Sequence, residues 1–111
     1  MQYYSGALDI LSDQADPHSA VEVAMLLGQV LSDAERKDEA AEHYIDALVL
    51  AEANDFRMLQ GELLARLGEV ESDRSQKMDY LQRSLSVFRE LGAVDRMRDV
   101  QTSVHKAVMG H

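Results

Sequence analysis

The sequence predicts an all-α fold of about six helices that stack as antiparallel pairs. The 111-residue chain repeats itself at an offset of forty residues, most visibly in LGQVLSD at 27–33 and LGEVESD at 67–73. Within each period the apolar residues recur at spacings of three and four, which is the spacing of one face of a helix. The signals of strands, alternating β-branched runs and Asn-Gly hairpin turns, do not occur in the sequence.

The repeat extends well beyond the heptapeptide. Identical residues stand one period apart at several other places, among them Tyr4 and Tyr44, Leu8 and Leu48, Glu22 and Glu62, and Lys37 and Lys77. A unit of this length forms one helical hairpin, which cannot bury its apolar face alone, so neighbouring units are expected to stack in series.

Helix starts are indicated by acidic residues at similar places in successive periods. Asp16 stands before Pro17, which is the pattern of an N-cap followed by proline in the first turn. Asp55 and Asp95 occupy nearly the same place one and two periods later, so we expect helices to start there as well.

Helix ends are indicated by Gly92, which suits a left-handed C-cap, and by Asn54, which can end a helix in the same way. The predicted helices span residues 2–14, 17–32, 37–53, 56–72, 77–91 and 96–109. A chain of this length forms one core, and we interpret 1–111 as a single helical repeat domain. Its parts are a half unit at 1–14, units at 17–53 and 56–92, and a half unit at 96–109.

The first complete unit contains LLGQVLSDAERKDEAAEHYIDAL at residues 26–48. This stretch resembles the tetratricopeptide repeat, whose first helix carries a Leu-Gly pair and whose second carries small and aromatic residues at fixed offsets. Leu27 and Gly28 take the Leu-Gly positions, and Ala40, Tyr44 and Ala47 take the small, aromatic and small positions. We expect Gly28 to let the two helices of the hairpin approach closely.

The second unit fits the same pattern less closely. Leu67 and Gly68 match, whereas Tyr80 stands at the expected alanine and Ser84 at the expected aromatic residue. The usual unit has about 34 residues, so the chain resembles a long-period, forty-residue variety of the family. The resemblance implies a right-handed superhelical stack with a concave surface, lined by the first helix of each unit, in which peptides or partner helices lie.

The family's geometry also implies which residues face that surface. They are Glu22, Met25, Gln29 and Asp33 from one helix, Glu62, Arg66, Glu69 and Asp73 from the next, and Thr102, His105 and Met109 at the far end. Their charges are mostly acidic, which favours a basic or amphipathic peptide. The peptide-contacting asparagine of cell-polarity adaptors is replaced here by Gln29 and Glu69, and the Lys/Asn pattern of chaperone-binding repeats is missing.

Composition argues against several other functions. Twenty acidic against eleven basic residues give a net charge of −9, which repels the phosphates of nucleic acids. Cysteine is absent, and the N-terminal residues show neither an export signal nor a membrane-spanning run, so we expect a cytoplasmic protein without membrane contact. The four histidines lack metal-ligand spacing and no nucleotide loop or nucleophile motif occurs, so we expect no enzyme, metal or cofactor.

Two functions remain open at this point. The first is a non-catalytic protein-interaction scaffold, and the second is a regulatory or dimerisation segment of a larger bacterial signalling or transcription protein. The predicted helix 2–14 carries more apolar residues than one neighbouring helix can cover, including Tyr4 and Leu8. Since exposed apolar surface marks interfaces, we expect either a longer repeat array or a homodimer that buries Tyr4 and Leu8 through the terminal helices.

Overall fold

The computed structural model describes residues 16–109, and over this range it consists of five α-helices without a strand. The helices are α2 (Pro17–Asp33), α3 (Lys37–Ala53), α4 (Arg57–Val70), α5 (Arg74–Leu91) and α6 (Val94–Met109). The predicted all-α class is confirmed for these residues. The predicted helix 2–14, with Tyr4 and Leu8, lies outside the described residues.

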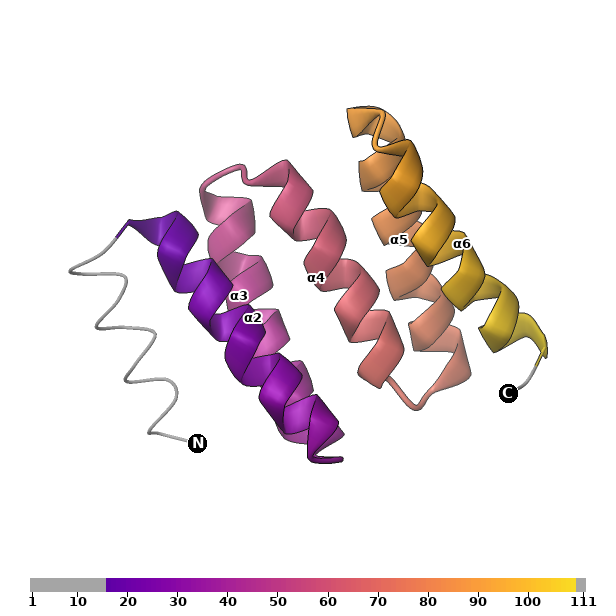
Figure 1. Cartoon of the computed structure of the whole chain (residues 1–111), viewed down its shortest axis with the longest axis horizontal. Coiled ribbons are helices and arrows are strands. Elements are labelled where there is room, and N and C mark those ends of the chain that lie inside the picture. The colour runs from indigo at the N-terminus through magenta and orange to yellow at the C-terminus, as the bar shows by residue number, and fades with distance from the viewer. Residues whose placement is uncertain (1–15, 110–111) are drawn as a thin grey trace.

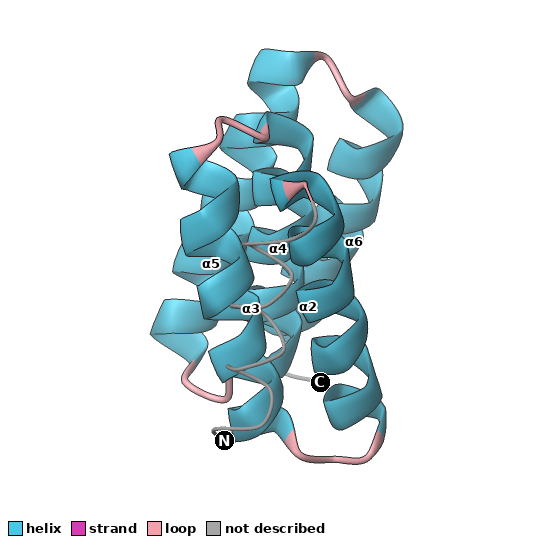
Figure 2. Ribbon diagram, turned by 90° about the vertical axis from the view of Figure 1, so that its left-hand side faces the viewer, coloured by secondary structure: helices cyan, strands magenta, loops and turns pink. Residues whose placement is uncertain are grey.

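The helices pack in two layers, and each helix runs antiparallel to the next. Figure 1 shows α2, α4 and α6 nearest the viewer, with α3 and α5 behind them. Figure 2 shows the same helices from the side, with short loops joining them at the two ends of the bundle. Two hairpins, α2–α3 and α4–α5, therefore stand side by side, and α6 packs against α5.

The core follows the same serial order. A first cluster joins α2, α3 and α4, with Val87 of α5, and includes Val21, Tyr44, Leu63 and Leu67, each exposed by 1% or less. A second cluster joins α5 to α6 through Leu81, Phe88 and Val100, with Met97 and Val104 packed against it. Burial of each such side chain stabilises the fold by about 1.5–3 kcal/mol. Because the main contacts join helices that follow one another in the chain, each helix is held mainly by its sequence neighbours.

Two predicted helix caps are confirmed. The carboxylate of Asp16 accepts a hydrogen bond from the backbone nitrogen of Ser19 at 2.8 Å, and Pro17 is the first residue of α2. This hydrogen bond lowers the pKa of Asp16. At the end of α5, Gly92 has a left-handed backbone with φ of 69°. There the nitrogen of Ala93 donates to the carbonyl of Phe88 at 2.9 Å, which closes the last turn of the helix.

Helices end or start near the other predicted caps, but the cap geometry differs from the prediction. Asp55 does not cap α4; it takes a left-handed φ of 57° after α3, and Phe56 precedes α4 without a side-chain cap. Asn54 is not left-handed, since its φ is −108°, although its side-chain amide donates to the carbonyl of Leu50 at 2.9 Å. Asp95 lies inside the first turn of α6. Residues 54–56 join α3 to α4, and Asp55 takes its left-handed conformation in the turn that ends α3, where the nitrogen of Phe56 donates to the carbonyl of Ala51. Asp55 therefore does not stand directly before α4 and does not cap it.

Three helix boundaries also differ from prediction by two residues or more. The predicted helix 56–72 ends at Val70, and the predicted helix 77–91 begins at Arg74. The cause is Asp73, whose carboxylate accepts from the backbone nitrogen of Gln76 at 3.0 Å and so caps α5. The last helix begins at Val94 instead of residue 96.

Candidate functional site

The first candidate site is a groove between α2 and α4. It has a volume of about 390 Å³ and is lined by Glu22, Met25, Leu26 and Gln29 from α2 and by Leu59, Glu62 and Arg66 from α4. Five of the eleven residues predicted to face a partner lie in this lining, namely Glu22, Met25, Gln29, Glu62 and Arg66. The structure therefore brings together residues that are up to 44 positions apart in the chain.

A second groove lies between α4 and α6 and has a volume of about 370 Å³. It is lined by Glu62, Ala65, Arg66 and Glu69 from α4, Phe88 from α5, and Arg96, Asp99 and Val100 from α6. The four α4 residues are the counterparts, one period later, of the four α2 residues in the first groove. The sequence repeat thus produces a repeated groove, and we call the surface of α2, α4 and α6 that carries both grooves the groove face.

The first groove combines apolar and polar side chains. Met25 and Leu59 are buried at 8% and 9% exposure, whereas Leu26 is 67% exposed. Glu22 and Glu62 lie toward the starts of their helices, and Gln29 and Arg66 lie about two turns and one turn further along. A bound group would therefore meet carboxylates at one end of the groove and an amide and a guanidinium at the other.

The guanidinium of Arg66 is held by a network that ties α2 to α4. Its Nη1 donates to Oε1 of Gln29, and Nε2 of Gln29 donates to the carboxylate of Asp33 at 2.9 Å. Burial raises the pKa of the Tyr44 hydroxyl, and a hydrogen bond with Arg66 acts in the opposite direction. Arg66 therefore joins three helices through hydrogen bonds to neutral side chains of α2 and α3.

The carboxylate of Glu62 also has a partner. Nη1 of Arg96 forms an ion pair with Oε1 of Glu62 and so links α6 to α4 across the second groove. Sequence reasoning missed Arg96 because it lies 34 residues from Glu62, which is not the period of the repeat. The lining is consequently less acidic than predicted, since it includes this second arginine.

Three predicted residues of α6 do not line either groove. Thr102, His105 and Met109 are exposed on the surface of that helix. The buried side chain of Val100 fixes which face of α6 packs inward. His105 lies five residues further along, which turns it about 140° away around the helix axis.

The predicted residues Asp33 and Asp73 stand at helix ends instead of on the groove walls. Asp33 is the last residue of α2 and bonds to Gln29, while Asp73 caps α5. Glu69 is exposed and lines the second groove.

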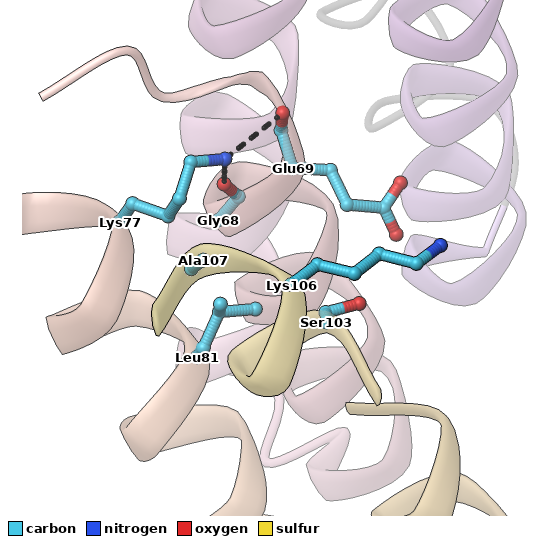
Figure 3. A pocket seen from close by; sticks show the side chains of 7 residues that line it. All are labelled: Gly68, Glu69, Lys77, Leu81, Ser103, Lys106 and Ala107. Carbon is cyan, nitrogen blue, oxygen red and sulfur yellow. Dashed lines mark hydrogen bonds between the residues drawn. The ribbon is translucent and has the colours of Figure 1, made fainter. Parts of the chain in front are cut away.

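A third cavity, of about 380 Å³, lies where α4 ends beside α5 and α6 (Figure 3). Nζ of Lys77 donates there to the carbonyl oxygens of Gly68 at 2.5 Å and Glu69 at 3.4 Å. Burial lowers the pKa of Lys77, and the positive charge of Lys37 lowers it further. Because the end of a helix carries unpaired carbonyls and partial negative charge, Lys77 acts as a cap of α4.

Other kinds of site find no support in the part of the chain that the structure describes. Between residues 16 and 109, His, Asp and Glu side chains do not gather in threes in a way that could hold a metal ion. None of the helices in that range combines the length and the apolar character that crossing a membrane requires. No model of a known protein family matches the chain, and no curated protein is significantly similar to it in sequence.

Proposed function

We propose that this chain is a non-catalytic protein-interaction scaffold that binds an extended peptide or a partner helix along the groove face. The observation that carries the proposal is the repetition of the groove: equivalent residues of α2 and α4 line two neighbouring grooves on one face. Stacked helical hairpins commonly use such a continuous surface for extended partners. A right-handed, tetratricopeptide-like stack in the cytoplasm belongs to the same proposal, as does a binding role for the residues predicted from the sequence.

The partner is a basic or amphipathic peptide or protein segment. The chain carries a net charge of −9, and the carboxylates of Glu22 and Glu69 are exposed on the groove face. Glu62 contributes as well, although a basic group of the partner has to compete with Arg96 for it. Attraction between such exposed charges is screened within about 8 Å at physiological ionic strength, so binding is expected to weaken as salt is added.

Charge reversal tests this proposal. Twelve-residue peptides are first selected from a random display library on the unmodified chain, and their affinities are then measured by fluorescence anisotropy at low and high salt. The double variant Glu62→Lys with Glu69→Lys should bind them about tenfold more weakly, and with a flatter salt dependence, because two attractive charges become repulsive.

A matched control separates the groove face from net charge. Glu42 and Glu52 are exposed on α3, so Glu42→Lys with Glu52→Lys makes the same change of charge on another helix. This control should bind the peptides nearly as well as the unmodified chain. Peptide binding that survives the groove-face reversal would instead place the interface on α3 and α5 or at the ends of the stack.

A second candidate function is self-association as a dimerisation or regulatory segment. Three apolar residues of α2 are less buried than their counterparts on α4: Val23, Leu27 and Val30 against Leu63, Leu67 and Val70. The contrast is largest for Val30, which is 65% exposed, whereas Val70 is 8% exposed in the core cluster shared with α3. Light scattering tests this candidate, since a chain that stays monomeric at high concentration, with Val30→Asp no different, would exclude it.

A further inference from the structure

The two grooves of the groove face are equivalent by sequence position but differ in chemistry. Where the first groove has Met25 and Leu26, the second has Ala65 and Arg66. Where α4 contributes Leu59 to the first groove, α6 contributes Asp99 to the second. The first groove therefore has an apolar floor, whereas charged side chains of α4 and α6 surround the buried Phe88 and Val100 in the second.

Leu26 is the residue that makes the first groove unusual. Its side chain is 67% exposed, although it lies beside Met25 and Leu59, which are 8% and 9% exposed. An apolar partner group placed between α2 and α4 would cover Leu26 and rest on the two buried side chains. Such burial is favourable roughly in proportion to the apolar area removed from water.

The charged residues around this floor determine which partner residue can lie next to the apolar group. At one end the carboxylate of Glu22 has a 58% exposed side chain and lies 3.4 Å from the ring of His18, so it remains accessible to a cation from a partner. At the other end Arg66 is bound to Gln29. A basic group thus fits beside Glu22, since the other carboxylate at this end, that of Glu62, already pairs with Arg96.

We infer that the partner is anchored by one large apolar side chain, such as Leu, Met or Phe, that lies between α2 and α4 with a Lys or Arg next to it facing Glu22. The second groove receives a polar stretch of the same partner. This inference rests on the proposed function, and it adds that specificity comes from a single anchor at the first groove instead of from both grooves equally.

The test replaces Leu26 by the residue found at its counterpart. Leu26→Arg gives the first groove the side chain of the second, and it should weaken binding of the library-selected peptides by at least about tenfold. Leu26→Gln removes the apolar contact without adding charge and should also weaken binding. Val49→Arg is the matched control, because Val49 is 61% exposed on α3, and it should leave affinity unchanged.

The selected peptides themselves provide a second readout. Their common feature should be one large apolar residue beside Lys or Arg, and replacing that apolar residue by Ser should reduce affinity as much as Leu26→Gln does. Helical circular dichroism and the melting temperature of each variant check that the fold is retained. Glu22→Gln should reduce affinity only a few-fold, since an exposed charge contributes little.

The outcomes separate the two proposals. If charge reversal at Glu62 and Glu69 weakens binding but Leu26→Arg and Leu26→Gln do not, the groove face binds peptides and the single apolar anchor is wrong. If Val49→Arg weakens binding as much as Leu26→Arg, the anchor is also wrong, because added charge alone explains the loss. If no peptide is enriched, or if none responds to any groove-face variant, both proposals fail.

Discussion

The hairpins α2–α3 and α4–α5 each bring an aromatic ring against a glycine, but at different positions of the repeat. In α2–α3 a Cβ added to Gly28 would overlap the ring of Tyr44. In α4–α5 a Cβ added to Gly61 would lie 2.5 Å from the ring of Phe88. The counterparts of Gly61 and Phe88 in the first hairpin are Val21 and Leu48, both buried. The second hairpin thus has one small and one large residue, Gly61 and Phe88, where the first has two side chains of medium size.

The positions of Gly28 and Tyr44 changed in the complementary way. Their counterparts are Gly68 and Ser84, so the second hairpin keeps the glycine but lacks the ring. Leu81 fills the space instead, since a Cβ on Gly68 would lie 2.6 Å from its side chain. Ser84 is fully buried, and its hydroxyl donates to the carbonyl oxygen of Gly61 at 2.7 Å. The close contact predicted at Gly28 is confirmed, and Gly68 makes one as well.

The comparison shows that the two hairpins fill the space between their helices with different residues at equivalent positions. Tyr80 lies half-buried beside the first core cluster, whereas Leu81 and Phe88 pack against Gly68 and Gly61. Dense packing explains this, since interiors leave few voids and each loss has to be filled by a neighbour.

The largest effect is expected from Phe88→Ala. Phe88 is 1% exposed and covers Gly61, so the variant leaves a cavity and should lower the free energy of unfolding by about 3–5 kcal/mol. Urea denaturation measures the change. Leu91→Ala is the control on the same helix, where the side chain is 41% exposed and the loss should be well below that of Phe88→Ala.

The exchange between the hairpins can be reversed by copying Val21 and Leu48 into the second hairpin. Gly61→Val alone should destabilise by about 1–3 kcal/mol, because its side chain would overlap the ring of Phe88. The double variant Gly61→Val with Phe88→Leu should recover much of that loss. A double-mutant cycle by denaturation gives the coupling, and strictly additive losses would contradict the compensation.

The hydrogen bond of Ser84 belongs to the second hairpin, and it should contribute less to stability than the packing of Phe88 against Gly61. Ser84→Ala removes the donor to the carbonyl of Gly61 and should lower the free energy of unfolding by about 0.5–1.5 kcal/mol. Ser103→Ala, on α6 with a longer contact of 3.5 Å to the carbonyl of Asp99, is a suitable reference and should change stability less. Equal losses in the two variants would mean that the buried bond has no particular role.

The smallest expected effect concerns the ends of the helices, and it raises the free energy of unfolding instead of lowering it. Glu35 and Asp55 follow α2 and α3 with φ of 62° and 57°, the conformation that Gly92 adopts after α5 with φ of 69°. Glu35→Gly should stabilise the chain by about 0.5–1 kcal/mol, because glycine adopts this conformation without steric cost. Asp55→Gly should gain less, since aspartate tolerates it better. Thermal unfolding would contradict this if Glu35→Gly melted at a lower temperature.

Much of the local structure and part of the candidate site were predictable from the sequence. Apolar spacing sufficed for the all-α class of residues 16–109, and residue type sufficed for the caps at Asp16 and Gly92. These features depend on neighbours three or four positions away, which a single sequence displays directly. The resemblance to a helical repeat also implied that Glu22, Met25, Gln29, Glu62 and Arg66 share one surface, and all five line the first groove.

Only the tertiary structure decided which residues meet across larger separations. The ion pair of Glu62 with Arg96, the contact of Gly61 with Phe88, and the outward direction of His105 all depend on how one helix is rotated against the next. That rotation is set by the volumes packed between helices, such as Val100 under α6, and no local pattern encodes it.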